Sequence, residues 1–162
     1  GIREPLIIKW PGKIKKGILN SSIVSSVDFY PTILELADVE PDPQQYLDGI
    51  SLVSTLKKSK ENSDRDIYWH YPVYHHDIPK SVILKGNFKL IENLVDGSLE
   101  LYDLSMDISE SQNLVQSMPE LASELHGLLK VWQEDVGAEF PTTNSNFDPS
   151  RRNLWSKHPD RK

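Results

Sequence analysis

The chain has 162 residues, of which 38% are hydrophobic and 26% are charged, a balance typical of a folded domain rather than a disordered segment. Its formal charge of -6 provides no overall basic field, so neither a nucleic acid nor a membrane surface is expected as a partner. The sequence has no cysteine, which excludes disulfides, cysteine-bound zinc and a cysteine-derived nucleophile within these residues. No apolar run approaches the roughly 20 residues of a membrane-spanning helix.

The first 40 residues predict one strand and one helix. The apolar run at residues 6–8 lies between Pro5 and a Trp-Pro-Gly turn, as expected of a short buried strand. Asp28 stands where a helix N-cap belongs. The apolar side chains that follow have the spacing of one helix face: Tyr30, Ile33, Leu34 and Ala37. Residues 41–66 then predict a linker with a short helix that carries Leu52 and Leu56 on one face.

A small antiparallel sheet is predicted next, because apolar and aromatic residues now alternate with period two. The expected strands cover residues 67–74, 81–84, 88–94 and 99–104. Gly86-Asn87 and Asp96-Gly97 are hairpin dipeptides between the later strands. Their positions predict a meander.

A long helix follows the sheet. Ser117 and Glu120 have the spacing of a capping box, and the apolar stripe beyond them is expected to lie on the sheet: Leu121, Leu125, Leu128, Trp132 and Val136. Gly137 is expected to end the helix. Residues 138–162 show neither helix nor strand periodicity and predict an irregular tail.

Three histidines stand in the aromatic-rich stretch 68–77: His70, His75 and His76. Imidazoles can hydrogen-bond a substrate, and aromatic faces can stack on a sugar or aryl ring. The alternative is structural, because an aromatic strand also builds the core of a small sheet and the two adjacent histidines suit a solvated loop. Adjacent histidines do not easily converge on one ion, so no metal site is expected here.

A second polar cluster consists of Asp103, Asp107, Glu110 and Asn113. It lacks the ordered pattern and central glycine of a calcium loop. Turn and cap roles are expected instead. The residues contain no Ser-His-Asp arrangement, phosphate loop or dinucleotide fingerprint.

Five segments, taken in order, resemble the C-terminal part of a type I sulfatase over residues 1–132. They are GIREPLIIKWPG at residues 1–12, DFYPTILELA at 28–37, LDGISL at 47–52, GNFKLI at 86–91, and LYDL at 101–104 with Asp107, Glu110, Asn113 and Leu114. The stretch YWHYP at 68–72 is most similar to bacterial sulfatases of the arylsulfatase A and N-acetylgalactosamine-6-sulfatase kind.

The resemblance implies an α+β fold: a small antiparallel four-stranded sheet packed by a long C-terminal helix, preceded by the last strand and helix of an alkaline-phosphatase-like α/β domain. The implied division is the end of that domain at 1–40, a linker at 41–66, the sheet subdomain at 67–137 and the tail at 138–162. The chain begins at Gly1 without Met, and we expect a fragment of a longer protein.

The resemblance also implies sulfuric ester hydrolysis by the full-length protein, acting on a sulfated saccharide or an aryl sulfate. Family chemistry uses a formylglycine and a calcium ion, and their motifs are absent here, so both are expected in the missing N-terminal sulfatase domain. On this resemblance no catalytic residue and no metal residue is assigned in this chain. This chain is then expected to supply part of the substrate-cleft wall, with His70, His75 and His76 as substrate-binding residues. A periplasmic or extracellular location is implied by the same family.

Two positions depart from the family pattern: Leu84 stands where relatives usually have Arg, and Ile108 replaces a common Pro. The loss of an arginine removes a five-donor fork, so an anion held there must be held otherwise. Two alternatives stay open at this point. One is part of a phosphodiesterase or phosphonate hydrolase of the same superfamily, and the other is a stand-alone carbohydrate-binding module.

Overall fold

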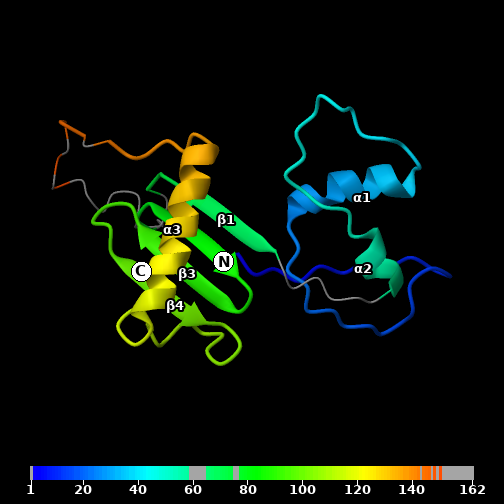
Figure 1. Cartoon of the computed structure of the whole chain (residues 1–162), viewed down its shortest axis with the longest axis horizontal. Helices are drawn as coiled ribbons and strands as arrows, with labels where there is room; N and C mark the ends of the chain where they lie inside the picture. The colour runs from blue at the N-terminus through cyan, green and yellow to red at the C-terminus, as the bar shows by residue number, and fades with distance from the viewer. Residues whose placement is uncertain are drawn as a thin grey trace. The chain divides into compact units, whose positions relative to one another are not determined.

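The structure is a computed structural model, which describes residues 2–58, 65–74, 77–142, 144–146, 148 and 150 (Figure 1). The chain divides into two compact units, Gly1–Arg65 and Asp66–Lys162. The finer division of the chain into four stretches stays a prediction. Within the described residues, no helix is both long and apolar enough to cross a membrane.

Unit 1 contains a short 3-10 helix, η1 (Ser26–Asp28), followed by α1 (Phe29–Leu36) and α2 (Val53–Lys58). Both predicted helices are thus confirmed. The predicted strand at residues 6–8 is wrong for this structure, because these residues form no strand and Ile7 is 90% exposed. A strand needs a hydrogen-bonded neighbour, and no other strand is assigned among the described residues of this unit.

Asp28 is fully buried and stands at the predicted N-cap position of α1, but its side chain makes no capping hydrogen bond to that helix. Its carboxylate instead accepts hydrogen bonds from the backbone N–H of Ser25 (2.7 Å) and of Ile50 (3.0 Å). Arg65 Nη1 adds contacts of 2.7 Å and 2.6 Å to the two carboxylate oxygens. One buried charge therefore joins three separate segments of unit 1.

Gly49 lies at the closest approach of two of these segments. A Cβ at this position would lie 2.1 Å from the carbonyl oxygen of Val27. Only glycine fits there without a movement of the backbone. Thr32 strengthens the same junction, since its hydroxyl donates to the Asp28 carbonyl (2.5 Å) and accepts from the N–H of Leu52 (2.9 Å).

Unit 2 is a four-stranded antiparallel meander in the order β1-β2-β3-β4. Its strands are β1 (Asp66–Tyr71), β2 (Lys80–Lys85), β3 (Phe88–Asn93) and β4 (Leu99–Asp103). Gly86 and Gly97 have φ angles of 56° and 73°, which side chains rarely adopt, and they form the two predicted hairpin turns. The predicted sheet, its order and both turns are confirmed.

Helix α3 (Pro119–Asp135) packs against β1, β2 and β3, and Figure 1 shows it running across the sheet. The core between them consists of Ile83, Leu90, Leu101, Ala122, Leu125 and Leu129. Leu121, Leu128 and Trp132 flank this core, half-buried. The buried stripe is therefore rotated slightly from the predicted one, and Val136, expected to belong to it, is exposed.

The two ends of α3 differ in how well they were predicted. Met118, not Ser117, is the N-cap, and no capping side-chain bond forms, because the Ser117 hydroxyl donates to the carbonyl of Leu114 (3.1 Å). At the other end, the N–H of Gly137 bonds Glu134 O (3.1 Å) and that of Ala138 bonds Gln133 O (2.8 Å). This is a Schellman ending, which Gly137 permits with a φ of 62°.

Candidate functional site

His70 lies on β1 opposite Ser81 of β2 and has both ring nitrogens hydrogen-bonded within unit 2. Nδ1 is 2.6 Å from the hydroxyl of the fully buried Ser81, and Nε2 is 2.7 Å from the backbone carbonyl of Glu139. A carbonyl oxygen can only accept, so Nε2 carries a proton. In the neutral ring Nδ1 then accepts from the Ser81 hydroxyl, which fixes the tautomer of His70.

Phe140 follows Glu139 and packs its ring edge-on against the His70 ring, with centroids 5.3 Å apart at 70°. The Lys130 ammonium lies 5.4 Å from the centroid of the same phenyl ring. Phe140 nevertheless remains 49% exposed. The imidazole thus holds the chain just after α3, where the Phe140 side chain is half-exposed.

Tyr68, two residues before His70, has the structural role that the aromatic pattern also allowed. Its ring stacks on Trp132 of α3 at 4.9 Å with an angle of 8° between the planes. Burial, followed by the charge of Asp66, raises the pKa of Tyr68. This aromatic side chain therefore joins the helix to the sheet.

Glu92 of β3 is a buried carboxylate, only 5% exposed, beneath α3. It accepts hydrogen bonds from His126 Nε2 (3.1 Å), Gln133 Nε2 (3.0 Å) and the Lys130 ammonium. Burial by itself raises the pKa of Glu92, but the hydrogen bonds from Lys130, His126 and Gln133 outweigh burial and lower it. Glu92 is thus held as a carboxylate.

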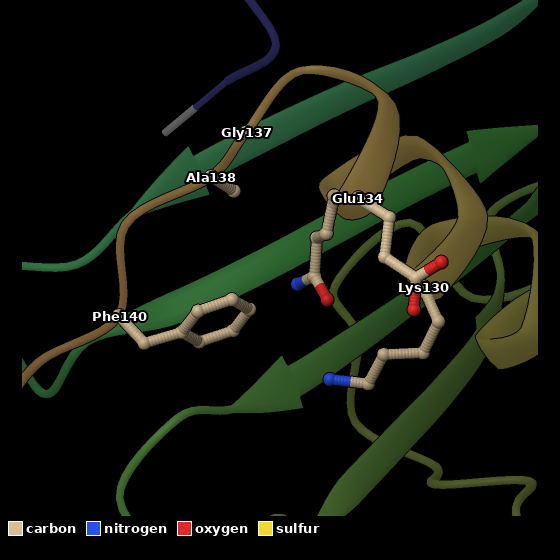
Figure 2. Close-up of a pocket in the computed structure, with 6 residues that line it drawn as sticks. Lys130, Glu134, Gly137, Ala138 and Phe140 are labelled. Atoms are coloured by element: carbon tan, nitrogen blue, oxygen red, sulfur yellow. The ribbon is translucent and has the colours of Figure 1, made fainter.

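A hollow at the C-terminal end of α3 lies beside this cluster (Figure 2). Its volume is about 240 Å³, and it is lined by Lys130, Gln133, Glu134, Gly137, Ala138 and Phe140. Gln133 is 2% exposed, and its Oε1 has no hydrogen-bond partner among the described residues. Figure 2 shows the Phe140 ring and the Lys130 side chain converging on the same space.

Of the three predicted substrate-binding histidines, the structure places His70 in this region, while His75 and His76 lie outside the described residues. The cluster around Glu92 was missed from the sequence. Two signals pointed to it: a glutamate within an otherwise buried strand, and His126, Lys130 and Gln133 at the spacing of one helix face. The sequence alone does not show that Glu92 meets these three residues, because their contact depends on how α3 packs on β3.

The oxygen-rich cluster has the predicted turn roles. Asp107 accepts from the N–H groups of Ser111 and Gln112, both at 2.8 Å, and these and neighbouring hydroxyl bonds lower its pKa, the Gln112 bond most. Asn113 Oδ1 accepts from the N–H of Leu101 (3.1 Å).

Glu110, in contrast, pairs with the buried Lys89 through contacts of 2.8 Å and 2.7 Å. Its carboxylate is therefore engaged by an ammonium group. Across the part of the chain that the structure describes, no group of three or more His, Asp or Glu side chains is arranged to hold a metal ion.

The fold defines the class of protein. Structures similar to the chain include a protein solved in complex with its substrate D-glucosamine-2-N,6-O-disulfate, with 33% identity, a TM-score of 0.67 and coverage of 79% of this chain and 27% of that one. A phosphonate monoester hydrolase from Silicibacter pomeroyi is similar in fold, with 20% identity, a TM-score of 0.54 and coverage of 89% and 29%. The neighbours belong to the alkaline-phosphatase-like superfamily.

The family follows from sequence. The family model "N-sulphoglucosamine sulphohydrolase, C-terminal" matches residues 1–135. A sulfatase from Formosa agariphila is 36% identical over 149 residues, covering 82% of this chain and 27% of that protein. An N-acetylglucosamine-6-O-sulfatase from Bacteroides thetaiotaomicron is 34% identical over 140 residues, covering 82% and 24%. The chain belongs to the sulfatase family and corresponds to its C-terminal part, about a quarter of the length of these relatives.

Proposed function

We propose that the full-length protein containing this chain is a sulfuric ester hydrolase that acts on a sulfated saccharide or an aryl sulfate. The observation that supports this most is the family match over residues 1–135. The relative solved with a glucosamine disulfate supports a saccharide as the substrate class. The sulfatase reading is better supported than the phosphonate hydrolase alternative, whose 20% identity concerns the fold alone.

The described residues do not fit the catalytic centre that the family implies. They contain no cluster able to hold calcium, and the formylglycine precursor motif is absent from the sequence. We therefore propose that both groups belong to the part of the protein that precedes this chain. The contribution proposed for this chain is part of the wall of the substrate cleft.

The wall residues that we propose are His70, His75 and His76. For His70 the structure sets a condition, because Nε2–H already donates to the carbonyl of Glu139. Binding of a substrate oxygen by this group requires the ligand to replace that carbonyl. The hydroxyl of Ser81, bonded to Nδ1, keeps the tautomer in which Nε2 is the donor.

The test is the kinetics of His70→Ala in the full-length enzyme. We expect kcat/KM on the native saccharide to fall about tenfold, the loss of one hydrogen bond to substrate, while the melting temperature stays within a few degrees. His126→Gln is the matched control, since this histidine of the same unit bonds Glu92 instead. Unchanged kinetics for His70→Ala, or equal losses in both variants, would remove His70 from the wall.

The choice of reaction is tested on the same full-length enzyme with matched aryl esters. Hydrolysis of an aryl sulfate in preference to the aryl phosphate and phosphonate supports the sulfatase proposal. The reverse preference contradicts it.

We further propose a periplasmic or extracellular location, supported by the family resemblance alone. Fractionation of the source cells with an antibody against this chain tests it. Recovery of the protein with cytoplasmic markers contradicts the proposal.

A further inference from the structure

A short turn of unit 1, residues 9–16, concentrates positive charge in a chain whose formal charge is -6. Residues 5–27 contain Lys9, Lys13, Lys15 and Lys16 but no aspartate or glutamate. All four lysines are exposed. We refer to residues 9–16 as the lysine turn, and it forms a local cationic patch on an acidic protein.

The backbone of the lysine turn holds its charges close together. The carbonyl of Trp10 accepts hydrogen bonds from the N–H of Lys13 (3.1 Å) and from that of Ile14 (3.0 Å), and Gly12 has a φ angle of 76°. A turn closed in this way brings its first and fourth residues within about 7 Å of each other. Lys57 of α2 adds a further ammonium group, 6.0 Å from the centroid of the Trp10 ring. Several cations therefore share one small region of unit 1.

The lysines of the two units differ in their partners. In unit 2, each described lysine pairs with a carboxylate: Lys80 with Asp77, Lys85 with Asp66, Lys89 with Glu110 and Lys130 with Glu92. The four lysines of the turn form no ion pair within the part of the chain that the structure describes. Unpaired like charges at close range repel one another. A partner that carries several negative charges would relieve this repulsion, and its binding would also release counterions.

The surroundings of the lysine turn favour one kind of polyanion. The Debye length is about 8 Å at physiological ionic strength, so a flexible chain can be attracted by the turn alone, whereas a flat membrane or a long duplex also meets the acidic remainder of the protein. Single-stranded nucleic acids rely on bases stacked on aromatic rings, but the Trp10 ring already has the Lys57 ammonium over it. Residues 9–20 form no helix and so lack the amphipathic helix that lies in a membrane interface. A flexible polyanion without bases fits best.

We propose that the lysine turn binds a linear sulfated polysaccharide, whose sulfate groups pair with the ammonium groups of Lys9, Lys13, Lys15 and Lys16. The choice of a sulfated saccharide among flexible polyanions rests on the proposed function, whereas the cationic character of the turn does not. Lysine ammonium groups act as mobile point charges on flexible stems. Binding is therefore expected to follow the density of sulfate groups along the polymer rather than the identity of its sugars.

The experiment is isothermal titration calorimetry of the full chain with dextran sulfate, at neutral pH and several salt concentrations. We expect a dissociation constant of about 10–100 μM at about 50 mM sodium chloride, and a slope of log Kd against log salt of about 3, because each of four contacts releases about 0.7 counterions from a single-stranded polyanion. Uncharged dextran of the same length is expected not to bind. The titration measures binding without hydrolysis, so its outcome is separate from that of the sulfatase proposal.

A pair of double variants separates the turn from the overall charge. Lys15→Gln with Lys16→Gln removes two exposed, unpaired cations, and it is expected to weaken binding of dextran sulfate at least about tenfold and to lower the salt slope by about 1–2. Lys80→Gln with Lys85→Gln is the matched control. It changes the net charge equally but removes lysines that already pair with Asp77 and Asp66, and we expect its affinity to stay within about threefold of the parent.

Several results would overturn the proposal. Equal losses of affinity in the two double variants would show that net charge, not the lysine turn, attracts the polymer. Tighter binding of single-stranded polythymidylate DNA or of phosphatidylglycerol vesicles than of dextran sulfate, at equal salt, would assign the turn to a different partner. The same titration with the full-length protein completes the test, because an absence of binding there would show that the turn is covered in the whole molecule.

Discussion

The two units bury different kinds of side chain. Unit 2 closes an apolar core between one sheet face and α3, in which Ile83, Leu90, Leu101, Leu125 and Leu129 are fully buried. Unit 1 buries few apolar residues, chiefly Leu52 and Val53, and the residue at its centre is the charged Asp28. Unit 2 is thus stabilised mainly by removing apolar surface from water. Unit 1 relies more on a hydrogen-bonded charge.

The apolar residues of unit 1 are present but mostly lie at its surface. At least 38% of the surface of each of these side chains is exposed: Leu6, Ile7, Ile8, Ile18, Leu19, Phe29, Tyr30, Ile33 and Leu36. Apolar surface of this extent is typical of a segment that packs against further protein. Correct helix periodicity in α1 therefore does not by itself bury the apolar face of that helix.

The largest expected effect comes from opening the core of unit 2. Leu125→Ala removes a fully buried side chain and is expected to lower the free energy of unfolding by about 4 kcal/mol, because the lost transfer energy adds to that of a cavity. Urea unfolding followed by far-ultraviolet circular dichroism measures it. Val131→Ala, on an exposed position of the same helix, should change stability by less than about 0.5 kcal/mol. Equal effects would contradict the apolar core.

A smaller effect, but one confined to polar contacts, is expected from Asp28→Asn. The change leaves the Arg65 guanidinium without its counter-charge, and we expect about 3 kcal/mol of lost local stability. Amide hydrogen exchange at Ser25 and Ile50, whose N–H groups bond Asp28, measures this directly. Unchanged protection at both amides would show that unit 1 does not depend on the buried charge.

The smallest effect concerns Glu92 and its partners beneath α3. The folded-state pKa of Glu92 is lowered, so its carboxylate stabilises the fold fully above the unfolded pKa of about 4.3 and this stabilisation is lost as the pH falls through the lower folded value. Glu92→Gln is expected to cost about 1–3 kcal/mol at neutral pH. It should also flatten the acid-side decline in stability, measured by urea midpoints between about pH 6 and 3. If the stability of Glu92→Gln falls as steeply with decreasing pH as that of the parent, a group other than Glu92 causes the decline.

Local sequence signals predicted unit 2 well because its strands and turns are determined locally. Glycine at Gly86 and Gly97 allows left-handed turns, and period-two alternation sets which face of each strand is buried. The predicted start of α3 lies one residue before the observed start, and the predicted capping box does not form, because the hydroxyl of Ser117 donates to the Leu114 carbonyl instead. Residue spacing alone does not show which of two local hydrogen bonds of similar strength a serine hydroxyl will make.

The sequence by itself determined the order of the helices and of the four sheet strands, the meander, the glycine that ends α3 and, through five ordered segments, the family. Only the tertiary structure decided which polar groups meet: Asp28 with Arg65, Glu92 with the face of α3, and His70 with the Glu139 carbonyl. The reason is physical. Periodicity specifies which side chains turn inward, whereas a hydrogen bond depends on distances within a few tenths of an ångström between segments far apart in the chain. Those distances exist only once the sheet and helix have packed.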